Sequence, residues 1–260
     1  MITVTGNIDI TLIALYAFWI FFAGLLWYLR QEDRREGYPL ESDVGGKYPK
    51  DAWFFMPPPK TFVLPNGGGT KQVPDGTRDT REIAASRPHE YPGAPLYPTG
   101  DPLVDGVGPA SWAERSDTPD LMAEGELRIV PLRTSGGFSL NEKDPDPRGM
   151  EVYAADNVAV GTVTEVWVDR SECMVRYYEL QLGSGENALI KLLPVSFGNI
   201  KRGRGRTLVM HVRAITSEQF ARVPTIANPD RITRLEEERL VAYYGGGELY
   251  ATRFRQEPLF

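Results

Sequence analysis

The sequence predicts a single N-terminal transmembrane α-helix, followed by a mainly β cytoplasmic domain that forms a small barrel or sheet and carries a short C-terminal helix. Three observations predict this fold class. Residues 10–29 (ITLIALYAFWIFFAGLLWYL) contain no charged side chain, the following stretch is rich in proline and glycine, and strand-length apolar runs begin near Leu127. We therefore divide the chain into residues 1–36, 37–116 and 117–260.

The apolar stretch is long enough to cross a bilayer. At about 1.5 Å of rise per residue, a helix over residues 10–29 reaches roughly 30 Å, the thickness of the hydrocarbon core. A cleaved signal peptide is disfavoured, because residues 1–9 contain no Lys or Arg and the stretch ends in charged residues. Arg30, Arg34 and Arg35 follow it, so the positive-inside rule predicts an N-terminus outside the cytoplasm and a cytoplasmic C-terminal domain.

The predicted helix lacks the residues of a transport or pigment site. It contains no Asp, Glu, Lys, Arg or His, so we expect it to anchor the chain and to pack on other helices. Trp27 and Tyr28 are expected at the level of the cytoplasmic headgroups, where amphipathic rings are favoured.

Composition excludes several function classes. The net charge of -6 argues against nucleic acid as a partner. The single cysteine, Cys173, excludes an internal disulfide and a cysteine-rich metal cluster, and the two histidines, His89 and His211, lie in unrelated contexts. The glycine-rich residues 66–70 lack the Lys-Ser/Thr pair of a phosphate loop, so we predict a turn there.

The middle of the chain, residues 37–116, is extended but not simply a linker. Its prolines and glycines exclude long helices and central strands. It also contains many large apolar side chains, which a solvated tether would not carry. These include Trp53, Phe54, Phe55, Phe62, Val63, Leu64, Tyr91, Tyr97 and Trp112. We expect this segment to lie along the surface of partner subunits.

The C-terminal part predicts strands and then a helix. β-branched and aromatic runs recur from Leu127 to about residue 212, and residues 169–172 are expected to turn one long strand into the next. Residues 183–185 predict a further turn. Thr233 and Glu236 fit a capping box, and the helix that begins there is expected to end at the glycines 245–247.

Charged side chains provide the remaining candidates for chemistry. The carboxylates near residues 117–126, 169–172 and 236–238 could form one surface cluster with raised pKa values that holds protons, or an ordinary solvated face. The basic residues 201–206 (KRGRGR) could form a solvated loop, or contact anionic headgroups or an acidic partner.

Several stretches resemble the H subunit of the purple-bacterial photosynthetic reaction centre. They are GNIDITLIALYAFWIFFAGLLWYL with REGYPLE, PKTFVLP, PTGDPLVDGVGPASWAERSDTPDL, VTEVWVDRSECMVRYYELQL, FARVPTI and ITRLEEERLVAYYGGGELYA. The resemblance implies one transmembrane anchor, a cytoplasmic domain of the PRC-barrel type and a non-enzymatic accessory role that caps the L and M subunits. No cofactor is expected on this chain. The implied complex holds bacteriochlorophyll, bacteriopheophytin, quinones and non-haem iron on L and M.

The resemblance also implies which residues handle protons. Members of that family help conduct protons to the secondary quinone, and the positions are carried over by sequence match. Asp169, Glu172 and Arg176 match the proton-uptake region, while Asp120 and Glu236 match acidic positions nearer the quinone. Glu124 and Glu126 replace a His-Gly-His run of well-known members, so we expect weaker inhibition by zinc or cadmium.

The implied setting is the bacterial inner, photosynthetic membrane. Further partners are a cytochrome subunit, the light-harvesting antenna and membrane lipids, with no nucleic acid. Two alternatives come from other classes: a membrane-anchored PRC-barrel adaptor without a photosynthetic role, and a membrane-tethered enzyme. The second is disfavoured because the sequence contains no nucleophile motif, metal motif or cofactor loop.

Overall fold

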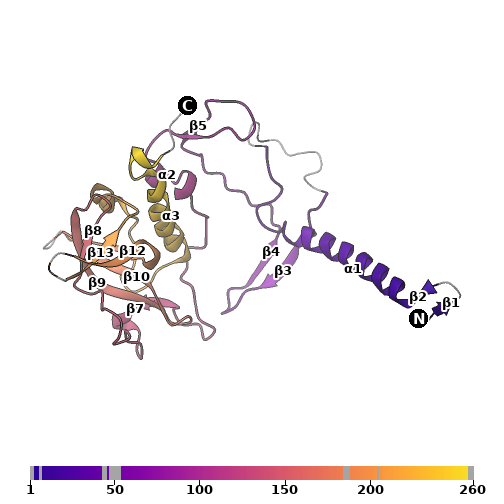
Figure 1. The fold of residues 1–260 in the computed structure, drawn as a ribbon, viewed down its shortest axis with the longest axis horizontal. Coiled ribbons are helices and arrows are strands. Elements are labelled where there is room, and N and C mark those ends of the chain that lie inside the picture. Colours follow the sequence, from indigo (N-terminus) through magenta and orange to yellow (C-terminus); the bar gives the residue numbers. More distant parts are fainter. Residues whose placement is uncertain are drawn as a thin grey trace. The chain divides into compact units, whose positions relative to one another are not determined.

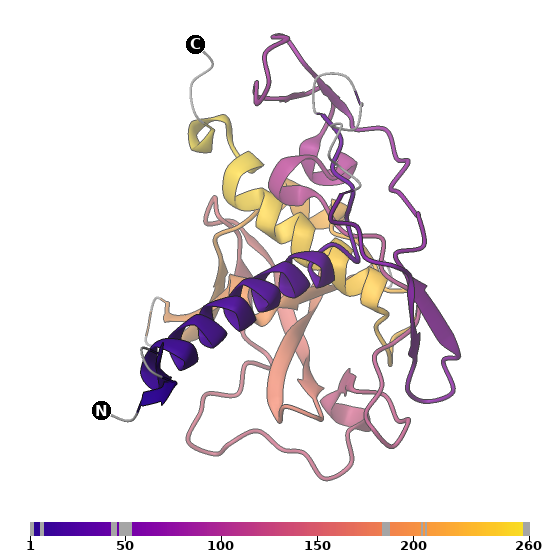
Figure 2. The ribbon, with the colours of Figure 1, turned by 90° about the vertical axis from the view of Figure 1, so that its right-hand side faces the viewer.

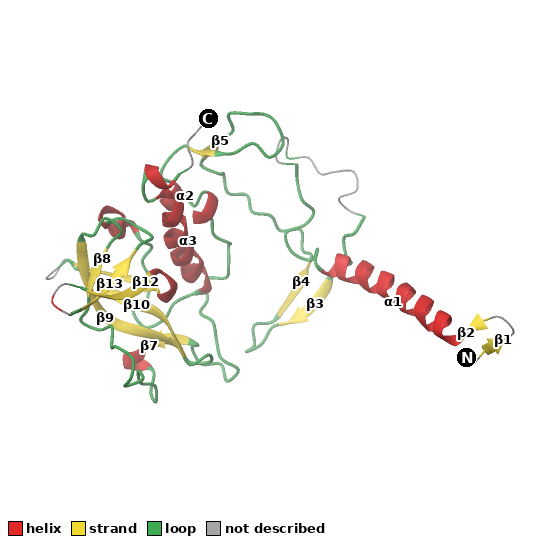
Figure 3. Cartoon of the chain, viewed as in Figure 1, coloured by secondary structure: helices red, strands yellow, loops and turns green. Residues whose placement is uncertain are grey.

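A computed structural model of the chain describes residues 3–5, 8–42, 46, 54–183, 188–203, 205 and 207–256. Its contacts group the chain into two compact units. The first comprises Met1–Thr80 with His89–Pro95, and the second comprises Arg81–Pro88 with Leu96–Phe260. Figure 1 labels most of the helices and strands, and Figure 3 distinguishes helices from strands by colour.

The first unit is built on the helix α1, Ile10–Glu32. The Asp9 side chain caps it by accepting a hydrogen bond from the N–H of Thr11 at 2.9 Å. Two short strands, β1 (Thr3–Thr5) and β2 (Ile8–Asp9), pair just before it. Within the described chain, α1 is the one helix that is long and apolar enough to cross a membrane, and none of its residues is buried.

A β-hairpin follows α1 in the same unit. Its strands β3 (Lys60–Val63) and β4 (Thr70–Val73) are antiparallel, with Val63 opposite Thr70. The glycine-rich residues between them form the turn, closed by a hydrogen bond from the N–H of Gly68 to the Pro65 carbonyl, as the sequence predicts. Figure 1 shows the hairpin beside the end of α1.

Seven strands of the second unit form one sheet, in the order β11-β10-β9-β8-β13-β12, with β7 paired to β9. Most pairs are antiparallel, and β13 and β8 are parallel. The strands are β7 (Ile129–Pro131), β8 (Glu151–Tyr153), β9 (Ala159–Asp169), β10 (Met174–Leu182), β11 (Leu189–Pro194), β12 (Gly198–Arg202) and β13 (Leu208–Val212). A separate short pair joins β5 (Ala85–Ser86) to β6 (Tyr97–Pro98). The predicted fold class is confirmed.

The second unit closes its core with the helix α3, Arg234–Tyr250. Thr233 and Glu236 form the predicted capping box. The expected end at residues 245–247 is wrong, because the helix continues through all three glycines. A Cβ at Gly246 would collide with Ala110, and one at Gly247 with the Ala214 carbonyl, so these glycines permit close packing.

The segment that precedes the sheet packs on α3. It contains the short helix α2 (Pro102–Asp105) and a 3-10 turn, Gly108–Ala110. Leu103 of α2 and Ala110 of the turn are buried in the core. The large buried side chains of this core include Trp167, Leu180, Leu192, Met210, Phe220 and Tyr244.

Some expectations concern residues that the structure does not describe. These are Trp53, part of the turn predicted at residues 183–185, and the arginines 204 and 206 of the basic cluster.

Candidate functional site

Asp169 lies at the end of β9 and is the centre of a charged cluster. Its carboxylate is fully buried and accepts hydrogen bonds from the Arg128 Nε at 3.0 and 3.1 Å and from the Arg176 Nε at 3.2 Å. The backbone N–H groups of Ser171 and Glu172 also donate to it, each at 2.9 Å. The predicted turn after β9 therefore folds around this side chain.

Glu172 lies at the exposed edge of the same cluster. Its two carboxylate oxygens contact two different guanidinium groups, that of Arg128 at 2.5 Å and that of Arg176 at 2.9 Å. The side chain is 46% exposed, so its carboxylate is accessible to solvent. Asp169, Glu172 and Arg176, which the sequence matched to a proton-uptake region, are brought together.

Asp120 extends the cluster toward α3. One of its oxygens contacts the Arg128 Nη1 at 3.2 Å, and the other contacts the Arg234 Nη2 at 2.7 Å. Arg128 therefore bridges three carboxylates, those of Asp120, Asp169 and Glu172. The predicted proximity of residues 117–126 to the turn after β9 is found for Asp120, through Arg128, and for Glu126, which pairs with Arg170 of that turn.

The pKa values in this cluster differ from those of the first alternative considered from the sequence, a proton-holding cluster with raised pKa values. Burial alone would raise the pKa of Asp169, but the Arg128 guanidinium and the two N–H donors outweigh it and hold the pKa below its ordinary value. Burial is likewise outweighed at Asp120, where Arg234 and Arg128 lower the pKa. That alternative is wrong for these two side chains, because each contacts two arginines.

A carboxylate with a raised pKa, in contrast to Asp169 and Asp120, lies on α3. Glu237 is half-buried and accepts a hydrogen bond from the Tyr177 hydroxyl at 2.8 Å. Burial raises the pKa of Glu237, and the negative charge of Asp120 adds to the increase, against the lowering effect of Tyr177, Arg176 and Arg128. Burial and the adjacent Glu237 raise the pKa of Tyr177, so its hydroxyl remains a donor. This carboxyl is easier to protonate than an ordinary glutamate.

The remaining predicted residues lie outside the central cluster. Glu126 is 60% exposed and pairs with Arg170 at 2.5 Å. Glu124 is exposed, and among the described residues its side chain has no hydrogen bond or ion pair. Glu236 accepts from the N–H groups of Thr233 at 2.8 Å and Ala227 at 2.7 Å. Its carboxylate caps α3.

Comparison with known families gives two matches. Residues 2–134, more than half of the chain, match the photosynthetic reaction centre H-chain N-terminal region. The chain belongs to the photosynthetic reaction centre H-chain family. Residues 141–214 of this H-family chain match the PRC-barrel domain, which covers most of the seven-stranded sheet. The resemblance seen in the sequence is confirmed.

Family membership defines the coarse role. The H-family chain is a subunit of a photosynthetic reaction centre, and together with α1 the match indicates a membrane-anchored protein. An adaptor without a photosynthetic role would leave the match over residues 2–134 unexplained. The charged cluster spans both matched regions, because Asp120 and Arg128 lie in the first and Asp169 lies in the second.

Sequence reasoning missed three members of the site, Arg128, Arg234 and Tyr177, and it placed Glu237 in the candidate cluster without giving it a role of its own. The arginines carry no local signal, because Arg128 is 41 residues from Asp169 along the chain. For Glu237 the sequence does contain a local signal. Glu237 lies three residues before the buried Leu240 and seven before the buried Tyr244, which is the spacing of one helix face. That spacing favours Glu237, rather than Glu236, as the inward carboxylate.

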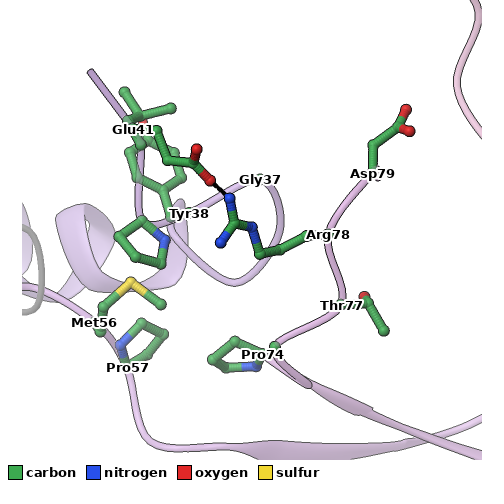
Figure 4. A pocket seen from close by; sticks show the side chains of 12 residues that line it. Gly37, Tyr38, Glu41, Met56, Pro57, Pro74, Thr77, Arg78 and Asp79 are labelled. Atoms are coloured by element: carbon green, nitrogen blue, oxygen red, sulfur yellow. Dashed lines mark ion pairs between the residues drawn. The ribbon is translucent and has the colours of Figure 1, made fainter. Parts of the chain in front are cut away.

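Two further features were considered as sites, a metal centre and a hollow in the first unit. Among the described residues of the H-family chain, no group of three or more His, Cys, Asp and Glu side chains could hold a metal ion. A hollow of about 620 Å³ lies in the first unit. Arg78 reaches across it to an ion pair with Glu41, beside Tyr38 and Met56 (Figure 4). The pair neutralises the charge of both residues and joins two segments of the chain.

Proposed function

We propose that this chain caps the L and M subunits of the reaction centre on the cytoplasmic side and helps conduct protons to the secondary quinone. In this proposal the chain is an accessory subunit without catalytic residues. L and M hold the bacteriochlorophyll, bacteriopheophytin, quinones and non-haem iron. Family membership and the charged cluster of the second unit support the proposal.

The observation that carries the proton role is the placement of an exposed carboxylate and a half-buried carboxyl around shared arginines. The Arg176 guanidinium pairs with Glu172 at 2.9 Å, and its charge also acts on Glu237. Glu172 is open to water, whereas Glu237 has a pKa that favours proton binding. We propose that Glu172 takes up a proton from solvent and that Glu237 receives it further inside, while the charges of the arginines around them stay unchanged.

Quinone reduction creates the need for such a route. Negative charge that forms on a quinone buried in a low-dielectric site costs free energy unless a proton compensates it. Carboxyl groups that exchange protons between water and the interior lower that cost. Asp169 has a different part, because two arginines hold it ionised as a fixed anion. Asp120 is paired in the same way.

The orientation in the membrane is part of the proposal. Arg30, Arg34 and Arg35 at the end of α1 favour a cytoplasmic location for the residues that follow and a periplasmic N-terminus. The proposed location is the inner, photosynthetic membrane of a bacterium. A cytochrome subunit and the light-harvesting antenna are further proposed partners.

The test replaces the exposed Glu172 and its buried neighbour Asp169 by amides. In reaction centres that carry Asp169→Asn with Glu172→Gln, we expect the second, proton-coupled electron transfer to the secondary quinone to slow by about tenfold or more. Primary charge separation should keep its wild-type rate, because no pigment contact is altered. Transient absorption after successive flashes measures both steps.

The matched control is Asp146→Asn, which removes a carboxylate of the same unit that pairs with Arg148 at 2.6 Å, outside the cluster. It should leave both steps unchanged. Wild-type proton uptake in the double variant would overturn the proposed roles of Glu172 as the entry carboxylate and of Asp169 as the fixed anion beside it.

A further inference from the structure

The β3–β4 hairpin is fixed to the end of α1 by one nearly buried side chain. The Arg35 guanidinium, 12% exposed, forms a bidentate contact with Glu32 at 2.6 and 2.9 Å. Its Nη1 also donates to the carbonyl oxygens of Pro58 at 3.0 Å and Val73 at 3.1 Å. Glu32 is the last residue of α1, and Val73 ends β4, so Arg35 sets the position of the hairpin relative to the helix.

Two lysines add to this attachment. Lys60 in β3 lies 3.9 Å from Glu32, and Lys71 in β4 lies 3.6 Å from Glu36. Figures 1 and 2 view the chain from directions at right angles, and in both the hairpin runs across the axis of α1 instead of continuing it. A hairpin that lies across a membrane-spanning helix runs along the membrane surface.

The attachment places the hairpin at the level of the lipid headgroups. The uncharged stretch of α1 ends at Leu29, and Glu32 is three residues further, about 4.5 Å along the helix axis. The headgroup region on each side of the hydrocarbon core is roughly 5–7 Å thick. The Trp27 ring packs against Phe55 at 4.9 Å between centroids, and aromatic rings of this kind favour the same level.

The far end of β3 exposes three consecutive apolar side chains. Val63 is 83% exposed, Phe62 is 40% exposed and Leu64 is 39% exposed. The lysines of the hairpin lie close by, and the Lys60 Nζ is 5.5 Å from the centre of the Phe62 ring. Apolar groups beside lysines suit the boundary between acyl chains and headgroups, because the chains accept the apolar groups and the phosphates attract the ammonium groups.

We propose that the free end of the β3–β4 hairpin is a second membrane contact of this chain. Phe62, Val63 and Leu64 enter the boundary between headgroups and acyl chains in the leaflet from which α1 emerges, instead of lying on a partner subunit as the sequence alone predicts. Lys60 and Lys71 lie at the level of the lipid phosphates. The inference rests on the membrane anchor and does not depend on the proposed proton role.

The experiment measures which medium surrounds Val63. Reaction centres carrying Val63→Cys and Cys173→Ser are labelled with a bimane fluorophore in nanodiscs of phosphatidylcholine and phosphatidylglycerol. Quenching is measured with lipids that bear a nitroxide near the headgroup end of the acyl chain, and separately with aqueous iodide. We expect the nitroxide lipid to quench this probe several-fold more strongly than iodide.

Two controls accompany the measurement. The same label on the natural Cys173, which is exposed in the second unit, should respond to iodide and not to the nitroxide lipid. Reaction centres with Cys173→Ser alone report any label on other subunits. Quenching of the Val63 probe by iodide alone would place the hairpin in water and overturn the proposal. Protection from both quenchers would place it against another subunit and overturn it equally.

Discussion

Asp169 and Glu237 lie in the same unit but have opposite electrostatic environments. Asp169 is fully buried and yet has a lowered pKa, because two arginines and two backbone N–H groups surround it. Glu237 is only half-buried, but burial raises its pKa, because its hydrogen-bond donor is the neutral Tyr177 hydroxyl and not a guanidinium, and that donor only partly offsets the effect of burial. Burial favours proton binding in both carboxyl groups. The arginines that contact Asp169 outweigh burial there.

This comparison assigns different tasks to the two carboxyl groups. A permanently ionised Asp169 shapes the field and holds the turn after β9, whereas Glu237 can change its charge. Arg128 contributes to both, since it contacts Asp169 directly and its charge lowers the pKa of Glu237. Variants that separate these tasks test the comparison.

The largest effect is expected from Arg128→Met. Removal of this guanidinium leaves the buried Asp169 carboxylate with one arginine instead of two and takes a partner from Asp120 and Glu172. We expect the free energy of unfolding of the full chain to fall by about 3 kcal/mol, the range found when a buried pair loses one partner. Denaturant titration of the purified chain measures it.

The control for that variant is Arg148→Met, which breaks an exposed ion pair with Asp146. Its cost should stay below about 1 kcal/mol. Equal losses in the two variants would show that Asp169 does not depend on Arg128, and the contrast between the two carboxyl groups would lose its basis.

The next effect is expected from Glu237→Gln. The amide still accepts the Tyr177 hydrogen bond but cannot take up a proton, so we expect proton-coupled quinone reduction to slow by about tenfold. Glu238→Gln is the matched control, because Glu238 is the adjacent carboxylate of α3 and pairs with Arg115 at 3.1 Å. Identical flash kinetics in the two variants would remove Glu237 from the proton route.

The same variant has a signature in stability. The raised pKa of Glu237 stabilises the fold below the pKa of the unfolded carboxyl, and this contribution is lost as the pH rises through the folded pKa. Glu237→Gln lacks that titration. Its melting temperature should therefore rise relative to wild type as the pH increases above the ordinary pKa of 4.5. A constant difference across the pH range would contradict the raised pKa.

The smallest effect is expected from added metal. Glu124 and Glu126 offer carboxylates without imidazole, and Glu126 is already paired with Arg170. Micromolar zinc or cadmium should change the rate of the second electron transfer by less than about twofold. Strong inhibition at that concentration would reveal a metal site near the proton route and would show that a further group controls proton uptake.

Local sequence patterns predicted the elements whose cause is local. The charge-free run of α1, the turn at residues 169–172 and the capping box at Thr233 each depend on neighbouring residues, and each appears as predicted. The strand β12, Gly198–Arg202, was missed because it is short and polar and is stabilised by pairing with β13. Pairing across a sheet leaves little trace in a five-residue sequence.

The errors have a shared physical origin in distant contacts. The glycines of α3 were expected to end the helix. They instead permit the close approach of Ala110 and Ala214, which cannot be predicted from the sequence of the helix itself. The alternative of raised pKa values in the acidic cluster failed for Asp120 and Asp169 for the same reason. Arg128 contacts both carboxylates, and Arg234 contacts Asp120, only in the folded chain. The proton roles of Asp120, Glu124, Glu126, Asp169, Glu172, Arg176 and Glu236 stay predictions.

The glycine contacts of α3 also constrain the order in which the second unit can fold during synthesis. Leu103 and Ala110 have their packing surface on a helix that leaves the ribosome more than one hundred residues later. Until α3 has been made, the apolar side chains of residues 103–110 and the side of the sheet that packs on α3 remain exposed to solvent. We therefore expect nascent chains that stop before Arg234 to bind chaperones, and the unit to fold only after α3 has been made.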